Sequence, residues 1–289
     1  MAHAAAASRP IVSWGIVPAL LVCLAAPAMF VLESRPLGWV LLLAGVALAA
    51  VPGLRGADRT ADRTAEWARP ASLTRDLALI AVGLVCTSAI GLEARLDNLS
   101  MLAFTLALGG AVVVPYALSR WAFRDHAIRF PWRGGGRWRP WQWAWLVAVL
   151  GLGWLILPFY FLTSGVYRNW PTVDDADLIA RLFVGVGAVG IWDELFFVCT
   201  VFALLRRHFH DGTANVLQAI VFVSFLWELG YRAWGPVLTI PFALLQGFIF
   251  LRTRSLAYVV TVHLLFDAVV FLVLVHAHNP GALDGLFLL

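Results

Sequence analysis

The sequence contains no lysine and few charges of any kind. All 21 of its basic residues are arginines, and charged residues make up 13% of the 289 positions. A soluble domain carries about 25% charged residues. Hydrophobic residues make up 61% of the chain, and its mean hydropathy is +0.83. A chain with so little charge cannot cover a surface with solvated groups, so the composition excludes a soluble protein and predicts an integral membrane protein.

Cysteine and phosphate-binding glycine motifs are also scarce. Cys23, Cys86 and Cys199 lie within apolar stretches and share no spacing typical of a metal site, so we expect free, buried thiols. The glycines at 134–136 follow no strand and precede no Gly-Lys-Ser/Thr, which excludes a phosphate loop. The arginines lie in short loops between apolar runs, so we expect no nucleic-acid partner despite a pI of 9.3.

Apolar runs long enough to cross a bilayer, about 20 residues each, recur along the whole chain. They predict an all-α, polytopic transmembrane helix bundle of about nine spans that contacts the lipid bilayer. The first run is longer than the roughly 7–15 apolar residues of a signal peptide, so we expect a retained helix. The expected spans are residues 11–33, 37–54, 76–93, 98–118, 141–163, 178–207, 213–231, 235–252 and 255–277.

The arginines provide an independent test of this topology, because cytoplasmic loops are enriched in positive charge. With nine spans and a cytoplasmic N-terminus, 16 of the 21 arginines fall on the cytoplasmic side. A missed or extra span would break this alternation. We expect a single membrane-embedded unit, in which residues 1–140 form N-terminal helices of unassigned role and residues 141–289 form the functional core.

The C-terminal half places five ionisable residues inside apolar helices. At the centre of a transmembrane helix such a residue costs on the order of 2.5–3.5 kcal/mol, so it usually marks a functional site. At ~1.5 Å per residue, the three carboxylates on separate helices lie roughly 18–22 Å from the cytoplasmic ends, and the histidine roughly 12 Å. We therefore expect these residues to converge: Asp193, Glu194, Glu228, His263 and Asp267.

Several kinds of chemistry are open to such a cluster. The groups could only satisfy one another between helices, or they could activate a water, relay protons, or bind a metal or cationic substrate. A histidine beside carboxylates could also hold zinc. His263 and Asp267 are four residues apart and share one helix face. The spacing alone does not choose among these functions.

Three segments resemble the motifs of the CPBP family, the CAAX protease and bacteriocin-processing (Abi) proteins. The family pattern is Glu-Glu-x-x-x-Arg, then Phe-x-x-x-His, then His-x-x-x-Asn/Asp, on separate membrane helices. The resemblance covers about residues 185–275. The matching segments here are Asp193-Glu194-Leu195-Phe196-Phe197-Val198, Trp227-Glu228-Leu229-Gly230-Tyr231 and His263-Leu264-Leu265-Phe266-Asp267.

The resemblance implies an intramembrane endopeptidase of the glutamate type, with a metal-free site and no cofactor. Its substrate would be a membrane-associated protein or peptide, and its location the inner (plasma) membrane of a bacterium. By resemblance, Asp193 activates the water and Glu194 occupies the second acidic position. His263 and Asp267 match the motif that stabilises the oxyanion.

Two positions depart from the family pattern. Val198 replaces the arginine of the first motif, and Tyr231 stands where the second motif has histidine. Tyrosine, with a pKa near 10, is a poor base at neutral pH, so Glu228 could supply the second titratable group. We expect either Glu228 or Tyr231 to assist proton transfer. Two rival functions stay open: a catalytically inactive membrane adaptor (pseudoprotease) with the same fold, and a proton-coupled transporter, although no inverted repeat is visible.

Overall fold

The computed structural model describes residues 15–51 and 71–288, and every regular element within these ranges is helical. The predicted all-α fold is confirmed for this part of the chain. Five of the arginines used in the topology argument (Arg9, Arg55, Arg59, Arg63 and Arg69) lie outside the described residues. The helices are α1 (Ile16–Phe30), α2 (Arg35–Ala50), α3 (Leu73–Thr87), α4 (Asn98–Ala117), α5 (Pro140–Ser164), α6 (Ala176–Asp193), α7 (Ala203–Leu205), α8 (Asp211–Leu229), α9 (Pro236–Thr253) and α10 (Leu256–His278).

Six helical stretches of the described chain are long and apolar enough to cross a membrane. Large apolar side chains on them are exposed, including Leu106 and Val147, as expected where helices contact lipid. The chain is therefore a multi-pass membrane protein. Helices α1, α2 and α3 occupy the first three expected spans, and each has 15 or 16 residues. The six longer stretches are Asn98–Ala122, Pro140–Ser164, Ala176–Leu205, Asp211–Leu229, Pro236–Thr253 and Leu256–His278.

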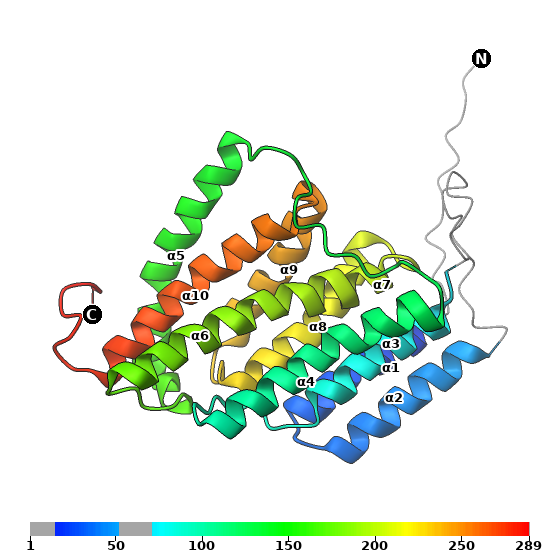
Figure 1. Cartoon of the computed structure of the whole chain (residues 1–289), viewed down its shortest axis with the longest axis horizontal. Helices are drawn as coiled ribbons and strands as arrows, with labels where there is room; N and C mark the ends of the chain where they lie inside the picture. The colour runs from blue at the N-terminus through cyan, green and yellow to red at the C-terminus, as the bar shows by residue number, and fades with distance from the viewer. Residues whose placement is uncertain (1–14, 52–70, 289) are drawn as a thin grey trace.

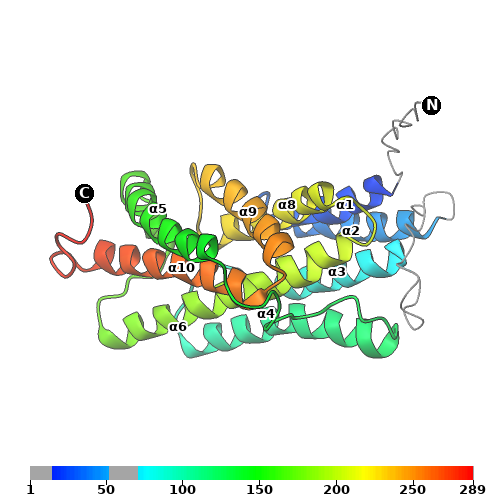
Figure 2. The same ribbon diagram turned by 90° about the horizontal axis from the view of Figure 1, so that it is seen from above.

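The helices pack as an elongated bundle with α6 and α10 side by side (Figure 1). Helix α10 packs between α5 and α6, and α8 packs against α1 and α9. Seen from above, α4 and α6 form one face of the molecule, and α5 and α9 lie on the opposite face (Figure 2). This arrangement encloses the inner sides of α6, α8 and α10, which carry the polar residues of interest.

Side-chain caps are present at the first turns of α10 and α6. The Ser255 hydroxyl accepts a hydrogen bond from the Tyr258 N–H (3.3 Å), and the Asp175 carboxylate accepts one from the Leu178 N–H (2.9 Å). Side-chain acceptors at these positions satisfy N–H groups that have no partner within the helix. The caps fix where α10 and α6 begin.

Aromatic side chains hold α6 between α4 and α8. The ring of Trp192 stacks on Phe196 with a centroid separation of 5.1 Å, and Phe197 stacks on Phe222 at 4.5 Å. The Trp192 indole N–H donates to the Leu108 carbonyl of α4 at 2.6 Å. Aromatic pairs of this kind add about 0.5–1.5 kcal/mol each beyond the burial of their area. The segment next to the polar cluster is therefore rigidly supported.

A buried ionic network joins the start of α3 to the turn after α7. Asp76 is 2% exposed. Its two oxygens lie 3.0 Å from Arg207 Nη1 and 2.6 Å from His208 Nε2, and Arg207 also contacts Asp125 at 2.7 Å. The network thus connects the N-terminal helices to the end of the stretch that contains Asp193.

We expect Asp76→Ala to lower the free energy of unfolding by about 1–3 kcal/mol, because it leaves His208 Nε2 without its carboxylate partner and leaves Arg207 with Asp125 alone. Thermal unfolding in detergent micelles would measure the loss. Asp211→Ala is the matched control, since it removes an ion pair between Arg206 and Asp211 whose side chains are 36% and 55% exposed. That variant should lose less than about 1 kcal/mol. Equal losses in the two variants would contradict a structural role for the network.

Candidate active site

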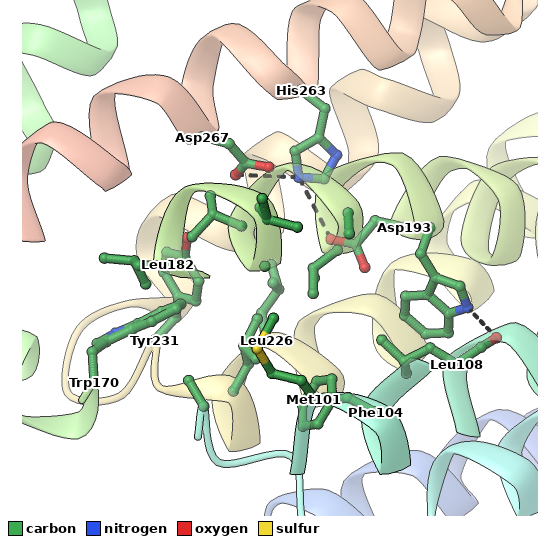
Figure 3. Close-up of a pocket in the computed structure, with 18 of the residues that line it drawn as sticks. Met101, Phe104, Leu108, Trp170, Leu182, Asp193, Leu226, Tyr231, His263 and Asp267 are labelled. Atoms are coloured by element: carbon green, nitrogen blue, oxygen red, sulfur yellow. Dashed lines mark hydrogen bonds and ion pairs between the residues drawn. The ribbon is translucent and has the colours of Figure 1, made fainter. Parts of the chain in front are cut away.

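Helix α6, Glu194 directly after it, and helix α10 bring one histidine into contact with three carboxyl groups. The Nδ1 atom of His263 lies 2.8 Å from Glu194 Oε1. Its Nε2 atom lies 3.5 Å from Asp193 Oδ2 and 3.8 Å from Asp267 Oδ1, the two contacts drawn in Figure 3. All four side chains are buried. The structure therefore assembles four of the five predicted residues around a single imidazole ring.

The Nδ1 side of His263 is fixed from a third helix. The Gln246 amide on α9 donates a hydrogen bond to Glu194 Oε1 at 2.7 Å and another to the Val259 carbonyl at 3.2 Å. Glu194 Oε1 therefore contacts both Gln246 and His263. This bonding holds the carboxyl group in place and orients the imidazole ring.

The Nε2 side of His263 faces a cavity of about 320 Å³. Asp193, His263 and Asp267 line it together with Tyr231, and its other walls are mostly apolar (Figure 3). Asp193 Oδ1 is buried and has no hydrogen-bond partner among the described residues. Buried polar atoms are nearly always paired with protein or water. A water or a substrate group that donates to Asp193 would therefore complete the site.

The backbone changes its helical form between the two acidic residues of the first motif. Asp193 ends the α-helical part of α6, and Glu194 begins a π-helical segment, Glu194–Phe202. The Thr200 hydroxyl donates to the Leu195 carbonyl five residues earlier, in keeping with the wider turn. Such segments occur frequently at functional sites. Here the two neighbouring carboxyl groups contact opposite nitrogens of His263.

Gly190 allows Asp267 to approach α6. A Cβ atom at this position would overlap with Asp267 Oδ2. Gly190→Ala is therefore expected to displace Asp267 and lower kcat/KM for any hydrolysis at this site by roughly 10–100-fold, because small misplacements of catalytic groups are costly. Gly187→Ala is the control, since a Cβ atom there meets nothing within 4 Å. Steady-state kinetics of both variants would check this, and an equal effect would argue against the close approach.

Glu228 lies away from the cluster, which corrects the expectation that all five residues converge. Its Oε1 accepts a hydrogen bond from the Leu92 N–H at 3.2 Å, in the loop before α4. The charged groups that act on it are Glu33, Arg35 and Arg232. The depth of Glu228 along α8 did not predict its contacts, because depth does not specify the direction in which the side chain points.

Tyr231 lines the cavity from the position that the second motif assigns to histidine. It follows Gly230, whose positive φ of 134° ends α8. Its ring packs edge-on against Phe161 and Trp170 at centroid distances of 5.7 and 5.6 Å. Burial, with a further contribution from Asp267, raises the pKa of Tyr231 well above its usual range. At neutral pH its hydroxyl is a neutral hydrogen-bond donor and not a base.

Two contributors to the site had no role in the sequence-based prediction. Gln246 is a buried amide in the middle of an apolar span, and such a residue signals a partner on another helix. Gly190 gives no comparable signal, because its importance arises only where α6 and α10 meet. Val198, at the position of the family's arginine, is buried in the apolar core and offers no charge.

The cysteines and possible metal ligands were also predicted from the sequence. Cys23, Cys86 and Cys199 are free, as predicted, and Cys23 and Cys199 are buried, whereas Cys86 is half-buried and not buried as expected. Within residues 15–51 and 71–288, no group of three or more His, Cys, Asp or Glu side chains could hold a metal ion.

The described chain is thus a bundle of membrane-length apolar helices that buries a histidine among three carboxyl groups beside a cavity. Residues 175–269 match the model of a family described as type II CAAX prenyl endopeptidase Rce1-like. This segment is therefore similar to that family, and the predicted resemblance to the CPBP family is confirmed over these residues. All four clustered residues and Tyr231 lie within the matched range. Comparison with curated proteins and with solved structures gives no match.

Proposed function

We propose that this protein is an intramembrane endopeptidase that hydrolyses a peptide bond of a membrane-associated protein or peptide. The observation that carries the proposal is the environment of the two ring nitrogens of His263. One nitrogen contacts Glu194 at 2.8 Å, and the other faces a cavity beside the unpartnered oxygen of Asp193. An imidazole oriented by a carboxylate and placed near a water site is suited to general acid–base catalysis.

In the proposed reaction Asp193 holds a water and His263 Nε2 accepts one of its protons. The water oxygen bonds to the substrate carbonyl carbon. Glu194 accepts a hydrogen bond from His263 Nδ1–H and so stabilises the charged imidazole. Tyr231 donates a hydrogen bond to the oxyanion that forms. His263 then returns the proton to the leaving nitrogen as the C–N bond breaks, which releases an amine and a carboxylic acid. Asp267 positions the Nε2 side of the ring.

This proposal differs in one respect from the roles that the family resemblance implies. The resemblance places His263 at the oxyanion, whereas its contact with Glu194 favours a role in proton transfer. Glu228 receives no catalytic step, because it is hydrogen-bonded to the loop before α4. That loop contributes Ala94, Arg95 and Leu96 to the cavity wall, so Glu228 acts as a positioning residue.

We also propose nine spans with a cytoplasmic N-terminus, in the inner (plasma) membrane of a bacterium. The helices of the described chain correspond one to one with the nine expected spans, when α6, Glu194–Phe202 and α7 are taken as one. Cavity-lining residues Arg95, Trp170 and Tyr231 come from three loops that this topology places on the non-cytoplasmic side. The cavity thus lies towards the side opposite the arginine-rich loops.

Peptide cleavage in liposomes tests the proposed activity directly. The purified full-length protein would be reconstituted with a library of membrane-anchored peptides, and new termini would be identified by mass spectrometry. We expect cleavage by the wild type and its loss in Glu194→Gln. Glu33→Gln is the matched control, because the Glu33 side chain is 73% exposed and does not line the cavity.

The same preparation distinguishes the rival functions. Saturable peptide binding without cleavage by the wild type would contradict the endopeptidase and support an adaptor. Proton uptake into the liposomes that is lost in Glu228→Gln would instead support a transporter.

A further inference from the structure

A second cavity, of about 210 Å³, lies on the other side of the site, between α5, α9 and α10. Phe242 and Phe266 line both cavities and therefore separate them. Gln246 also lines the second cavity, and its amide nitrogen is bonded to Glu194. Gln246 thus links the second cavity to the catalytic pair through a direct hydrogen bond.

Two buried polar atoms on the wall of this cavity have no partner among the described residues. Gln246 Oε1 is a hydrogen-bond acceptor, and the residue is 1% exposed. Trp145 Nε1, on α5, is a donor. Such atoms are normally satisfied by water or by a ligand. An acceptor and a donor on one apolar cavity match a group that can donate and accept at once, as a hydroxyl does.

The remaining walls define the rest of the ligand. None of the described residues that line the cavity is charged, so the ligand is neutral. Val149 and Leu245 supply apolar contacts for a hydrocarbon chain. Leu152 and Val237 line the cavity and are also 48% and 67% exposed, so the cavity is reachable from the lipid-facing surface. Its volume is below the 300–1,000 Å³ typical of drug-sized sites, which favours a short chain.

We propose that this second cavity binds a neutral amphiphile with a primary hydroxyl group and an aliphatic chain. The hydroxyl donates to Gln246 Oε1 and accepts from Trp145 Nε1, and the chain lies between α5 and α9. The bound hydroxyl fixes the Gln246 amide with its nitrogen towards Glu194. This last consequence, a stabilising effect on the catalytic pair, rests on the proposed function, whereas the binding itself does not.

Photolabelling of the full-length protein in nanodiscs tests the binding. The probe is a medium-chain primary alcohol that carries a diazirine, and its adducts are located by mass spectrometry. We expect saturable adducts on residues of α5 and α9 that line the cavity. Competition by an unlabelled alkanol or by a monoacylglycerol shows whether a free alcohol or a lipid hydroxyl is preferred. An alkane of the same length should compete poorly, because it cannot pair with either polar atom.

Matched variants separate polar recognition from simple partitioning into an apolar cavity. Trp145→Phe and Gln246→Met should each weaken labelling by about 5–10-fold, the effect of one lost hydrogen bond. Trp143→Phe should change nothing, because Trp143 is exposed and lies outside the cavity lining. Val149→Phe, which fills the cavity, should abolish labelling without loss of fold. Equal competition by the alkane, unchanged labelling in the first two variants, or no saturable adducts would overturn the proposal.

Discussion

Replacing His263 by alanine is expected to lower kcat/KM for peptide hydrolysis by on the order of 10²–10⁴-fold, the usual contribution of general acid–base catalysis. The variant loses the group that accepts the proton of water and returns it to the leaving nitrogen. It also leaves Glu194 without its contact to Nδ1. Steady-state kinetics with a peptide found to be cleaved by the wild type would measure the loss.

A double-mutant cycle separates this catalytic role from a structural one. If Glu194 acts only through His263, then the double variant Glu194→Gln/His263→Ala should be no slower than His263→Ala alone. Losses that multiply would mean that Glu194 acts independently of the imidazole. His278→Ala, at the far end of the same helix, should leave kcat/KM unchanged. Thermal unfolding in detergent would show that each variant is folded.

Much of the fold could be predicted from the sequence because bilayer thickness and backbone hydrogen bonding restrict the choices. Continuous apolar runs can only be satisfied as helices in a membrane, so positions and lengths follow from composition. Helix starts were readable where a cap was present, as at Asp175 and Ser255. The π-helical form of Glu194–Phe202 was not readable, since the same apolar residues fit either helix.

The candidate site was predictable only in part, for a geometric reason. His263 and Asp267 share a face at any helix orientation because they are one turn apart. By contrast, whether Glu228 points to α10 or to the loop before α4 depends on how α8 is rotated in the bundle. The sequence specifies how deep a side chain lies along its helix, whereas the packing between helices determines the direction in which it points.

The N-terminal helices take part in the site even though they carry no family motif. Residues of α4 and of the loop before it, including Met101, Phe104 and Arg95, form one wall of the cavity. This wall lies outside the matched range of 175–269. Since the walls of a cavity select what can enter it, we infer that substrate selection by the proposed endopeptidase depends partly on residues outside the matched range.

Introducing the second-motif histidine with Tyr231→His is expected to raise kcat by on the order of 10–100-fold, because the imidazole keeps an N–H donor for the oxyanion and adds a nitrogen that can accept a proton near neutral pH. Tyr231 already lines the cavity with Asp193 and His263, so the new imidazole would face the proposed water site. The tyrosine cannot act as this base, because burial raises its pKa well above the usual range. Kinetics between pH 5 and pH 8 should show a new rise in rate near the ordinary histidine pKa, roughly 6.5.

Two comparisons decide what Tyr231 itself contributes. Tyr231→Phe keeps the ring packed against Phe161 and Trp170 but removes the hydroxyl. If that hydroxyl stabilises the oxyanion, this variant should lose about 10²–10³-fold in kcat, the usual effect of removing one such donor. Tyr167→His is the matched control, because it introduces the same imidazole outside the cavity lining and should leave the pH profile unchanged. Wild-type activity in Tyr231→Phe would exclude the oxyanion role, and a histidine variant no faster than wild type would mean that the divergent motif does not limit the rate.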